Sequence, residues 1–220
     1  MIIPENELNE IEVKECDEGL IDISKYDDRI KIMISEYMKN TSLKKIFVRQ
    51  SVAEKLKEIQ NELPKNMNLM ITGGVRPLKI QKEIYDSFFE KSKKAHPKWD
   101  ENKIREETRK IVAPPNSIPP HPTGGAIDIT FYQNNQPLDM GCEIPMTIDT
   151  NNPNINKFPT NSKNITKEQR KNRGFLINLM KKHDFVNLES EWWHWSYGDR
   201  YWALKKNKKY AIYGTIQSIK

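Results

Sequence analysis

Residues 119–130 read PPHPTGGAIDIT and contain the pattern that decides the fold. Apolar residues alternate with small or polar ones across residues 126–131, as in a β-strand with one buried face. Ile127 and Ile129 therefore point to one side, and Asp128 projects from the other. The prolines and glycines before this strand indicate a loop. The stretch predicts a core strand whose second face carries an aspartate and whose entry is irregular.

The sequence around this strand predicts helices and further strands in no regular alternation. We expect strands at 20–23, 68–72, 193–197 and 210–216, and helices at 51–63, 77–93, 100–111 and 166–183. Elements that are mixed without a repeating strand–helix order indicate an α+β fold. We predict an irregular N-terminal arm at residues 1–19, followed by a single domain at 20–220.

Local signals refine several of these elements. Ser51 with Glu54 three residues later is typical of a capping box at a helix start. The helix at 166–183 has an apolar stripe made of Phe175, Leu176, Leu179 and Met180. The loop at 113–125 contains five prolines, and a loop of this length in a compact domain is usually functional. Residues 132–165 are rich in asparagine and proline and predict a long surface excursion.

Composition limits the possible functions of the chain. It has 220 residues, 36% of them hydrophobic and 30% charged, and a net charge of +6. The lysines alternate with glutamates, which is typical of a solvated surface, so we expect no nucleic-acid partner. No apolar run of about 18 residues is present, and we expect no membrane-spanning helix. The N-terminal sequence does not resemble a secretory signal, which favours a cytoplasmic location.

A second segment, ESEWWHWSYGD at residues 189–199, supplies another histidine. Two imidazoles and a carboxylate can hold a zinc ion and leave its fourth position open. His121, Asp128 and His194 are the candidate ligands, and Glu191 is the candidate base. Each segment alone is also explained by a loop histidine, a strand aspartate or a hydrogen-bonded core histidine. The two segments together favour metal-assisted hydrolysis.

Two features of this candidate site depend on the backbone. Residues three apart in a flat strand point to opposite faces, so Glu191 and His194 share a site only if the chain bends between them. We therefore expect Glu191 on a loop, turn or bulge. Arg76 follows a glycine pair at a predicted strand end, where its guanidinium is able to stabilise a developing oxyanion. An ordinary surface arginine is the alternative interpretation.

The motif HxxGxAxD beginning at His121, followed by ExWH beginning at Glu191, resembles the zinc D-alanyl-D-alanine dipeptidases of the vancomycin-resistance VanX type. These enzymes belong to a wider group of zinc D,D-peptidases that share a fold with the hedgehog signalling domain. The resemblance extends from about residue 20 to residue 216. It implies one zinc ion per chain held by His121, Asp128 and His194, with Glu191 as catalytic base and Arg76 as transition-state cation. It also implies a central, mainly antiparallel sheet flanked by helices.

We therefore predict a zinc-dependent hydrolase of D-Ala-D-Ala or similar D-amino-acid dipeptides. Two departures from the family pattern bear on the substrate: Pro119 replaces a common serine, and Pro145 replaces an aspartate that helps to bind the substrate ammonium. Glu143 or Asp149 would be a substitute. The alternatives are a D,D-carboxypeptidase or endopeptidase for longer peptidoglycan peptides, and a non-catalytic zinc-binding interaction module. The expected partner is a small dipeptide, and the oligomeric state stays open.

Overall fold

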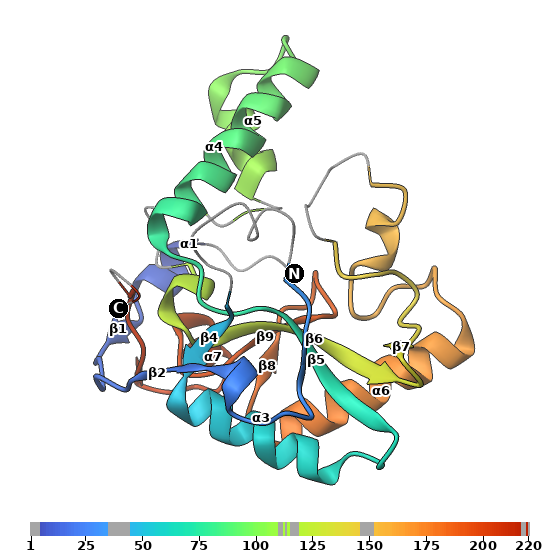
Figure 1. Ribbon diagram of the computed structural model, residues 1–220. Helices are drawn as coiled ribbons and strands as arrows, with labels where there is room; N and C mark the ends of the chain where they lie inside the picture. The colour runs from blue at the N-terminus through green and yellow to red at the C-terminus, as the bar shows by residue number, and fades with distance from the viewer. Residues whose placement is uncertain are drawn as a thin grey trace.

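A central β-sheet organises the chain in the computed structural model, which describes residues 5–34, 45–109, 112, 114, 119–145, 152–216 and 219. The strands of this sheet within the described residues are β3 (Lys31–Ile32), β5 (Met67–Gly73), β6 (Ala126–Gln133), β7 (Gln136–Pro137), β8 (Val186–Asn187) and β9 (His194–Ser196). Five of them follow the order β3-β5-β6-β9-β8, and β7 pairs with the end of β6. β3 and β5 run parallel and the other pairs antiparallel, which confirms the predicted sheet (Figure 1).

β6 lies in the middle of the sheet and separates two environments. Ile127 and Ile129 are 0% exposed and belong to the main hydrophobic core. Asp128 projects from the opposite face, where the register places it across from His194 of β9 and next to Gly73 of β5. The predicted alternation is thereby confirmed. One strand anchors the core with one face and supplies the candidate site with the other.

Two helices, α3 (Gln50–Glu62) and α6 (Lys167–Lys182), cover the core face of the sheet (Figure 1). Four residues of α3 are fully buried there: Val52, Ala53, Leu56 and Ile59. α6 begins with a capping box in which Thr166 and Gln169 bond each other's backbone amides. Burial of one apolar stripe per helix is what holds both helices on the sheet. The resulting layers confirm the predicted α+β class.

Two details of these helices contradict the sequence prediction. α3 begins at Gln50 after Arg49, with no side-chain cap, so the capping box predicted at Ser51 is wrong. The Ser51 hydroxyl donates instead to the Glu18 carboxylate. Phe175, predicted in the apolar stripe of α6, is 39% exposed. It lies about 100° round the helix from Leu176, which is buried.

A helical hairpin projects away from the sheet (Figure 1). It consists of α4 (Leu78–Ala95) and α5 (Glu101–Arg109), and α4 follows Pro77 as predicted. Tyr85 and Phe88 of α4 pack with Val112 in a small hydrophobic cluster of their own. Residues 110, 111, 113 and 115–118, which end the predicted helix and form much of the predicted loop, lie outside the described residues. Among the described helices, none is long and apolar enough to cross a membrane.

Several short elements lie outside the central sheet, and four of their strands form two small two-stranded sheets. They are α1 (Glu5–Asn9), β1 (Glu12–Val13), β2 (Leu20–Asp22), the 3₁₀ turn η1 (Ile23–Lys25), β4 (Phe47–Arg49), α7 (Arg200–Lys205) and β10 (Tyr210–Ala211). β1 pairs in parallel with β10, and β2 pairs antiparallel with β4. The arm predicted as irregular therefore contains a helix and a strand, and the strand predicted at 210–216 ends at Ala211. The domain boundary after residue 19 stays a prediction.

The described part of residues 132–165 is a surface excursion only in part: residues 134–137 are exposed, as predicted, but other residues of the segment are buried. Met140 and Phe158 are buried, and the segment includes the 3₁₀ turn η3 (Ile155–Lys157). Arg173 of α6, 1% exposed, donates hydrogen bonds to the carbonyls of Met140 (2.8 Å), Lys157 (2.7 Å) and Pro159 (2.7 Å). A buried arginine that satisfies three carbonyls fixes this loop against α6. Residues 146–151 lie outside the described residues.

Candidate active site

His121 opens a 3₁₀ turn, η2 (His121–Thr123), which ends at Gly124. Gly124 has a φ of +77°, in the left-handed region that glycine adopts without strain. The Nδ1 atom of His121 lies 2.9 Å from the carbonyl oxygen of Gly74. A carbonyl only accepts hydrogen bonds, so Nδ1 carries the proton in this contact. The lone pair of Nε2 is then free to bind a metal, as in many metal-ligating histidines.

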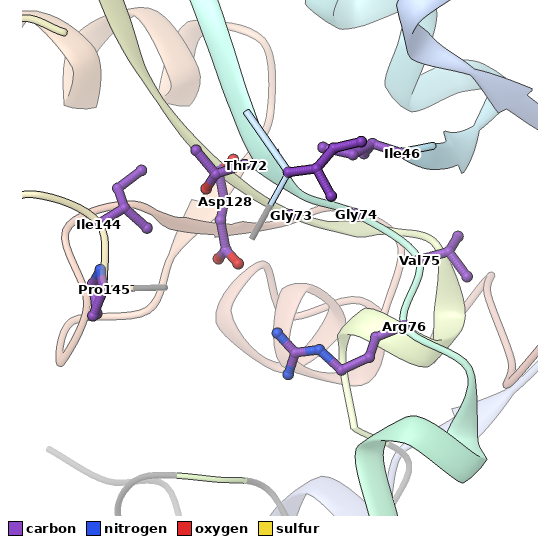
Figure 2. Close-up of a pocket in the computed structure, with 10 residues that line it drawn as sticks. Ile46, Thr72, Gly73, Gly74, Val75, Arg76, Asp128, Ile144 and Pro145 are labelled. Carbon is purple, nitrogen blue, oxygen red and sulfur yellow. Dashed lines mark hydrogen bonds between the residues drawn. The ribbon is translucent and has the colours of Figure 1, made fainter. Parts of the chain in front are cut away.

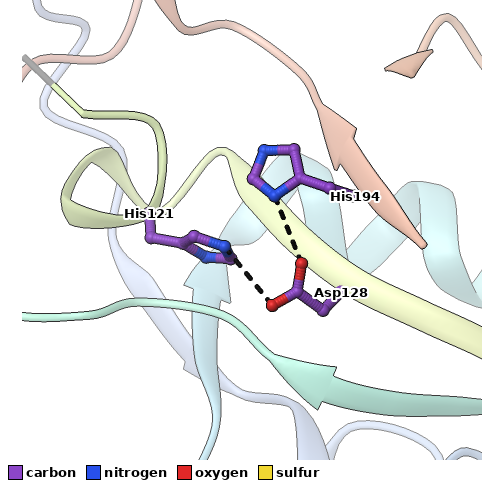
Figure 3. A group of neighbouring side chains, drawn as sticks. All are labelled: His121, Asp128 and His194. Carbon is purple, nitrogen blue, oxygen red and sulfur yellow. Dashed lines mark hydrogen bonds and ion pairs between the residues drawn. The ribbon is translucent and has the colours of Figure 1, made fainter. Parts of the chain in front are cut away.

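Asp128 lies between the two candidate histidines (Figure 3). Its Oδ2 atom is 3.4 Å from Nε2 of His121, and its Oδ1 atom is 3.2 Å from Nδ1 of His194. The two imidazole rings meet edge to face, with centroids 4.8 Å apart. One donor atom from each of the three side chains lies within 4.8 Å of the others. Two residues of the 119–130 stretch and one residue 66 positions after Asp128 thus converge on a single point.

Burial and mutual charge determine the protonation of this cluster. Burial raises the pKa of Asp128, but the imidazoles of His121 and His194 outweigh it and hold that pKa well below its usual range. Burial lowers the pKa of His121 more than the charge of Asp128 raises it. Burial also lowers the pKa of His194, but the hydrogen bond and charge of Asp128 raise it overall. The carboxylate is therefore anionic, and a bound cation would replace the proton shared with His194.

Glu191 lies in a turn immediately before β9, which confirms the predicted bend. The amide of Glu191 donates to the carbonyl of Leu188 (2.9 Å), and the amide of His194 donates to the carbonyl of Glu191 (3.2 Å). Asn187 of β8 holds the turn from the side, because its Nδ2 atom donates to the carbonyls of Glu191 (3.1 Å) and His194 (3.0 Å). This turn removes the alternation of a flat strand, so Glu191 and His194 are able to serve one site.

The side chain of Glu191 is partly buried beside the cluster. Burial raises its pKa to about 7, and the charge of Asp128 adds to the effect. The positive charges of His194 and Arg76 and a hydrogen bond with Trp193 act in the opposite direction. A carboxylate with a pKa near neutrality is suited to accepting and returning a proton at physiological pH.

Arg76 follows the end of β5, on a segment that passes close to the cluster. Its amide donates to the carbonyl of His121 (3.3 Å), and its Nη1 atom donates to Oε1 of Gln81 (3.1 Å). Figure 2 shows its guanidinium and the Asp128 carboxylate directed toward the same pocket. Glycine is required nearby, because a Cβ atom at Gly73 would lie 2.3 Å from Oδ2 of Asp128.

The wall of the pocket opposite Arg76 is apolar. Ile144 and Pro145 form it, on the segment fixed by Arg173 (Figure 2). Pro145 thus lines the pocket at the position where the family resemblance led us to expect an aspartate. Of the two substitutes considered, Glu143 is exposed and Asp149 lies outside the described residues. The wall next to Pro145 therefore offers apolar contact to a substrate.

Arg76 and Asp128 line one pocket, and the three other residues predicted from the sequence interact with Asp128. His121, Asp128 and His194 form the cluster, and the charges of Arg76 and Glu191 act on it. Their roles in catalysis stay predictions. Two positioning residues were missed, namely Asn187, which holds the Glu191 turn, and Gln81, which contacts Arg76. Neither belongs to a motif, and their contacts are visible only once the chain is folded.

Comparison with known proteins shows which family the chain resembles. The family model described as D-ala-D-ala dipeptidase matches residues 25–213. A D-alanyl-D-alanine dipeptidase from Synechocystis sp. is 29% identical, over 71% of this chain and 72% of its own.

Two solved structures are more distant. VanYB in complex with D-Alanine-D-Alanine is 15% identical, with a TM-score of 0.45 over 73% of this chain and 76% of its own. The LdcB LD-carboxypeptidase is 18% identical, with a TM-score of 0.49 over 93% of this chain and 77% of its own. The family match extends over most of the chain, so the protein belongs to the D-ala-D-ala dipeptidase family and is a metallopeptidase.

Proposed function

We propose that this protein is a zinc-dependent dipeptidase that hydrolyses D-Ala-D-Ala or a similar D-amino-acid dipeptide. The observation that carries the proposal is the convergence of His121, Asp128 and His194 beside a carboxylate with a raised pKa and an arginine that faces the same pocket. The family membership supports the reaction class. The name of the Synechocystis relative supports the substrate.

The donor set fits one zinc ion per chain. Nε2 of His121, the carboxylate of Asp128 and Nδ1 of His194 are two nitrogen donors and an oxygen donor, which is a common set for catalytic zinc with an open fourth position. The hydrogen bond from His121 to the Gly74 carbonyl fixes the required tautomer. A zinc ion bound there supplies Lewis acidity, which polarises the scissile carbonyl and lowers the pKa of water at the site toward ~7.

Glu191 and Arg76 supply the remaining chemistry. Glu191 removes a proton from the attacking water as the water oxygen bonds to the carbonyl carbon of the peptide. It returns that proton to the amine nitrogen as the carbon–nitrogen bond breaks. Arg76 donates hydrogen bonds to the carbonyl oxygen as that oxygen gains negative charge. One well-placed donor of this kind is worth about 3–4 kcal/mol in the transition state.

A second candidate is a D,D-carboxypeptidase acting on longer peptidoglycan peptides. Pro145 favours it, because an apolar pocket wall suits a substrate without a free ammonium at that position. Glu191 and Arg76 argue against a non-catalytic zinc-binding module, since a site that only binds metal needs neither. A cytoplasmic location also remains a proposal, based on the N-terminal sequence.

Hydrolysis of a dipeptide panel tests the proposal. The purified protein is assayed on the four stereoisomers of Ala-Ala and on a pentapeptide ending in D-Ala-D-Ala, with and without a chelator. We expect release of D-alanine from D-Ala-D-Ala, loss of this activity with the chelator and recovery on addition of zinc. Cleavage of the pentapeptide alone would support the carboxypeptidase. Activity that the chelator does not affect would contradict a zinc enzyme.

A further inference from the structure

Three buried polar atoms behind His194 have no hydrogen-bond partner among the described residues. They are Nε2 of His194, the hydroxyl oxygen of Ser196 and Oδ2 of Asp199. The three residues are 4%, 0% and 1% exposed, respectively. Two more atoms of this segment, Nε1 of Trp195 and Nε of Arg200, are also unpaired among the described residues. Buried polar groups are nearly always paired, so the imidazole, hydroxyl and carboxylate atoms require an explanation.

The backbone places these three side chains close together. His194 and Ser196 are the first and last residues of β9, so they point to the same face of the sheet. Asp199 follows at the start of α7, where Oδ1 accepts a hydrogen bond from the amide of Trp202 (2.8 Å). Burial raises the pKa of Asp199, and the Ser196 side chain partly opposes this effect. Burial lowers the pKa of His194, and the charge of Asp199 is one of several effects that raise it.

Capping of α7 accounts for the hydrogen bond of only one of the two Asp199 carboxylate oxygens. Oδ1 satisfies the helix amide, whereas Oδ2 is left for another donor. Asparagine and serine cap helices about as well as aspartate, so the cap alone does not require a buried charge. The cap likewise gives no role to the Ser196 hydroxyl or to Nε2 of His194.

We propose that His194 Nε2–H donates to the Ser196 hydroxyl and that this hydroxyl donates to Oδ2 of Asp199. This His194 network has one donor, one group that both accepts and donates, and one acceptor, so all three atoms are satisfied. It holds the proton on Nε2 of His194 and leaves Nδ1 bare to bind the metal. In His121 the Gly74 carbonyl holds the proton on Nδ1 instead and leaves Nε2 bare. Ser196 and Asp199 are thus positioning residues, and their role rests on the proposed zinc function.

Two substitutions break the network without removing a metal ligand. Ser196→Ala removes the central hydroxyl. Asp199→Asn keeps an oxygen for the Trp202 amide but turns the second atom from an acceptor into a donor. We expect each variant to bind zinc about 10–100-fold more weakly, a typical effect of losing the partner of a ligating histidine. Competition with a chromophoric chelator measures this affinity.

Thr130→Val is the matched control, because Thr130 also has a buried hydroxyl without a partner among the described residues and lies two residues from Asp128. We expect it to bind zinc as the wild type does. The visible spectrum of the Co²⁺-substituted protein gives a second readout. It should change in the Ser196 and Asp199 variants, because the coordination geometry changes, and not in the control.

The outcomes separate the network from the proposed function. If both variants keep the zinc affinity and cobalt spectrum of an active wild type, the His194 network is contradicted and the proposed function is not. A wild type that binds no zinc would contradict the network and the proposed function together. A downfield NMR signal from the Nε2 proton of His194 in the zinc-loaded wild type, lost in Ser196→Ala, is the result that we expect.

Discussion

Replacing Glu191 with glutamine should stabilise the metal-free protein while abolishing its activity. Burial raises the pKa of Glu191 from 4.5 to about 7. The folded protein therefore holds a proton on this residue that the unfolded chain has already released. Stability falls with rising pH wherever the folded state binds more protons, so the loss begins near pH 4.5 and is complete above pH 7. Glutamine carries no titrating proton and avoids this loss.

The size of the effect follows from the two pKa values of Glu191. Values of 4.5 and about 7 differ by about 2.5, which corresponds to about 3 kcal/mol at roughly 1.4 kcal/mol per pKa unit. Because the residue is only partly buried, solvent reduces this figure. We expect Glu191→Gln to raise the free energy of unfolding by about 1–3 kcal/mol near pH 8 and by less near pH 5.

Urea unfolding of the chelated protein near pH 5 and near pH 8 measures this difference. Glu106→Gln is the matched control, because Glu106 is an exposed glutamate on α5, and it should follow the wild type at both pH values. The expected pKa effect would be refuted if the free energy of unfolding changed with pH to the same extent in Glu191→Gln and in the wild type. That result would mean that Glu191 is not held in an environment that disfavours its charge.

Three other substitutions test other parts of the account. Gly73→Ala places a Cβ atom 2.3 Å from Asp128 Oδ2, so zinc affinity, measured by competition, should fall about 10-fold or more. Gly174→Ala is the control: Gly174 has open space around it, and its substitution should leave zinc affinity unchanged. Arg173→Met leaves loop carbonyls unpaired and should lower the free energy of unfolding by about 3 kcal/mol in urea titrations. Arg76→Met should reduce kcat about 100-fold or more in D-alanine release, with little change in zinc content.

The sequence predicted the parts of the fold that depend on local periodicity. Alternation along 126–131 located the core strand and the face that carries Asp128, because the side-chain period of a strand is fixed. The same rule required a bend before His194, and the structure has a turn there. These predictions needed no knowledge of the neighbouring segments.

Predictions that depended on long-range contacts were wrong or incomplete. Ser51 matched a capping box, but its hydroxyl contacts Glu18 from the N-terminal arm instead. Residues 132–165 had the composition of a surface loop, but Arg173 of α6 binds carbonyls of the described part, in which Met140 and Phe158 are buried. Asn187 looked like any polar residue. The partners of Ser51 and Met140 lie 33 residues away, whereas those of Asn187 lie only four and seven residues away. No local pattern identifies any of these contacts.

The candidate site was predictable because its residue types are chemically specific. Two histidines, an aspartate and a glutamate in two short motifs suggested a metal before any distance was known. The burial that sets the pKa of Glu191 was not visible in the sequence, nor was the apolar wall at Pro145. Both depend on segments that meet only in the folded chain.

The most direct test of the account is the rate of D-alanine release from D-Ala-D-Ala by the zinc-loaded Glu191→Ala variant, measured beside the zinc-loaded wild type. Glu191 is the proposed base and not a ligand, so the variant should hold one zinc ion per chain and lose activity by about 100-fold or more. A variant that retains near-wild-type turnover with zinc bound would contradict the central claim that Glu191 transfers the proton at this centre.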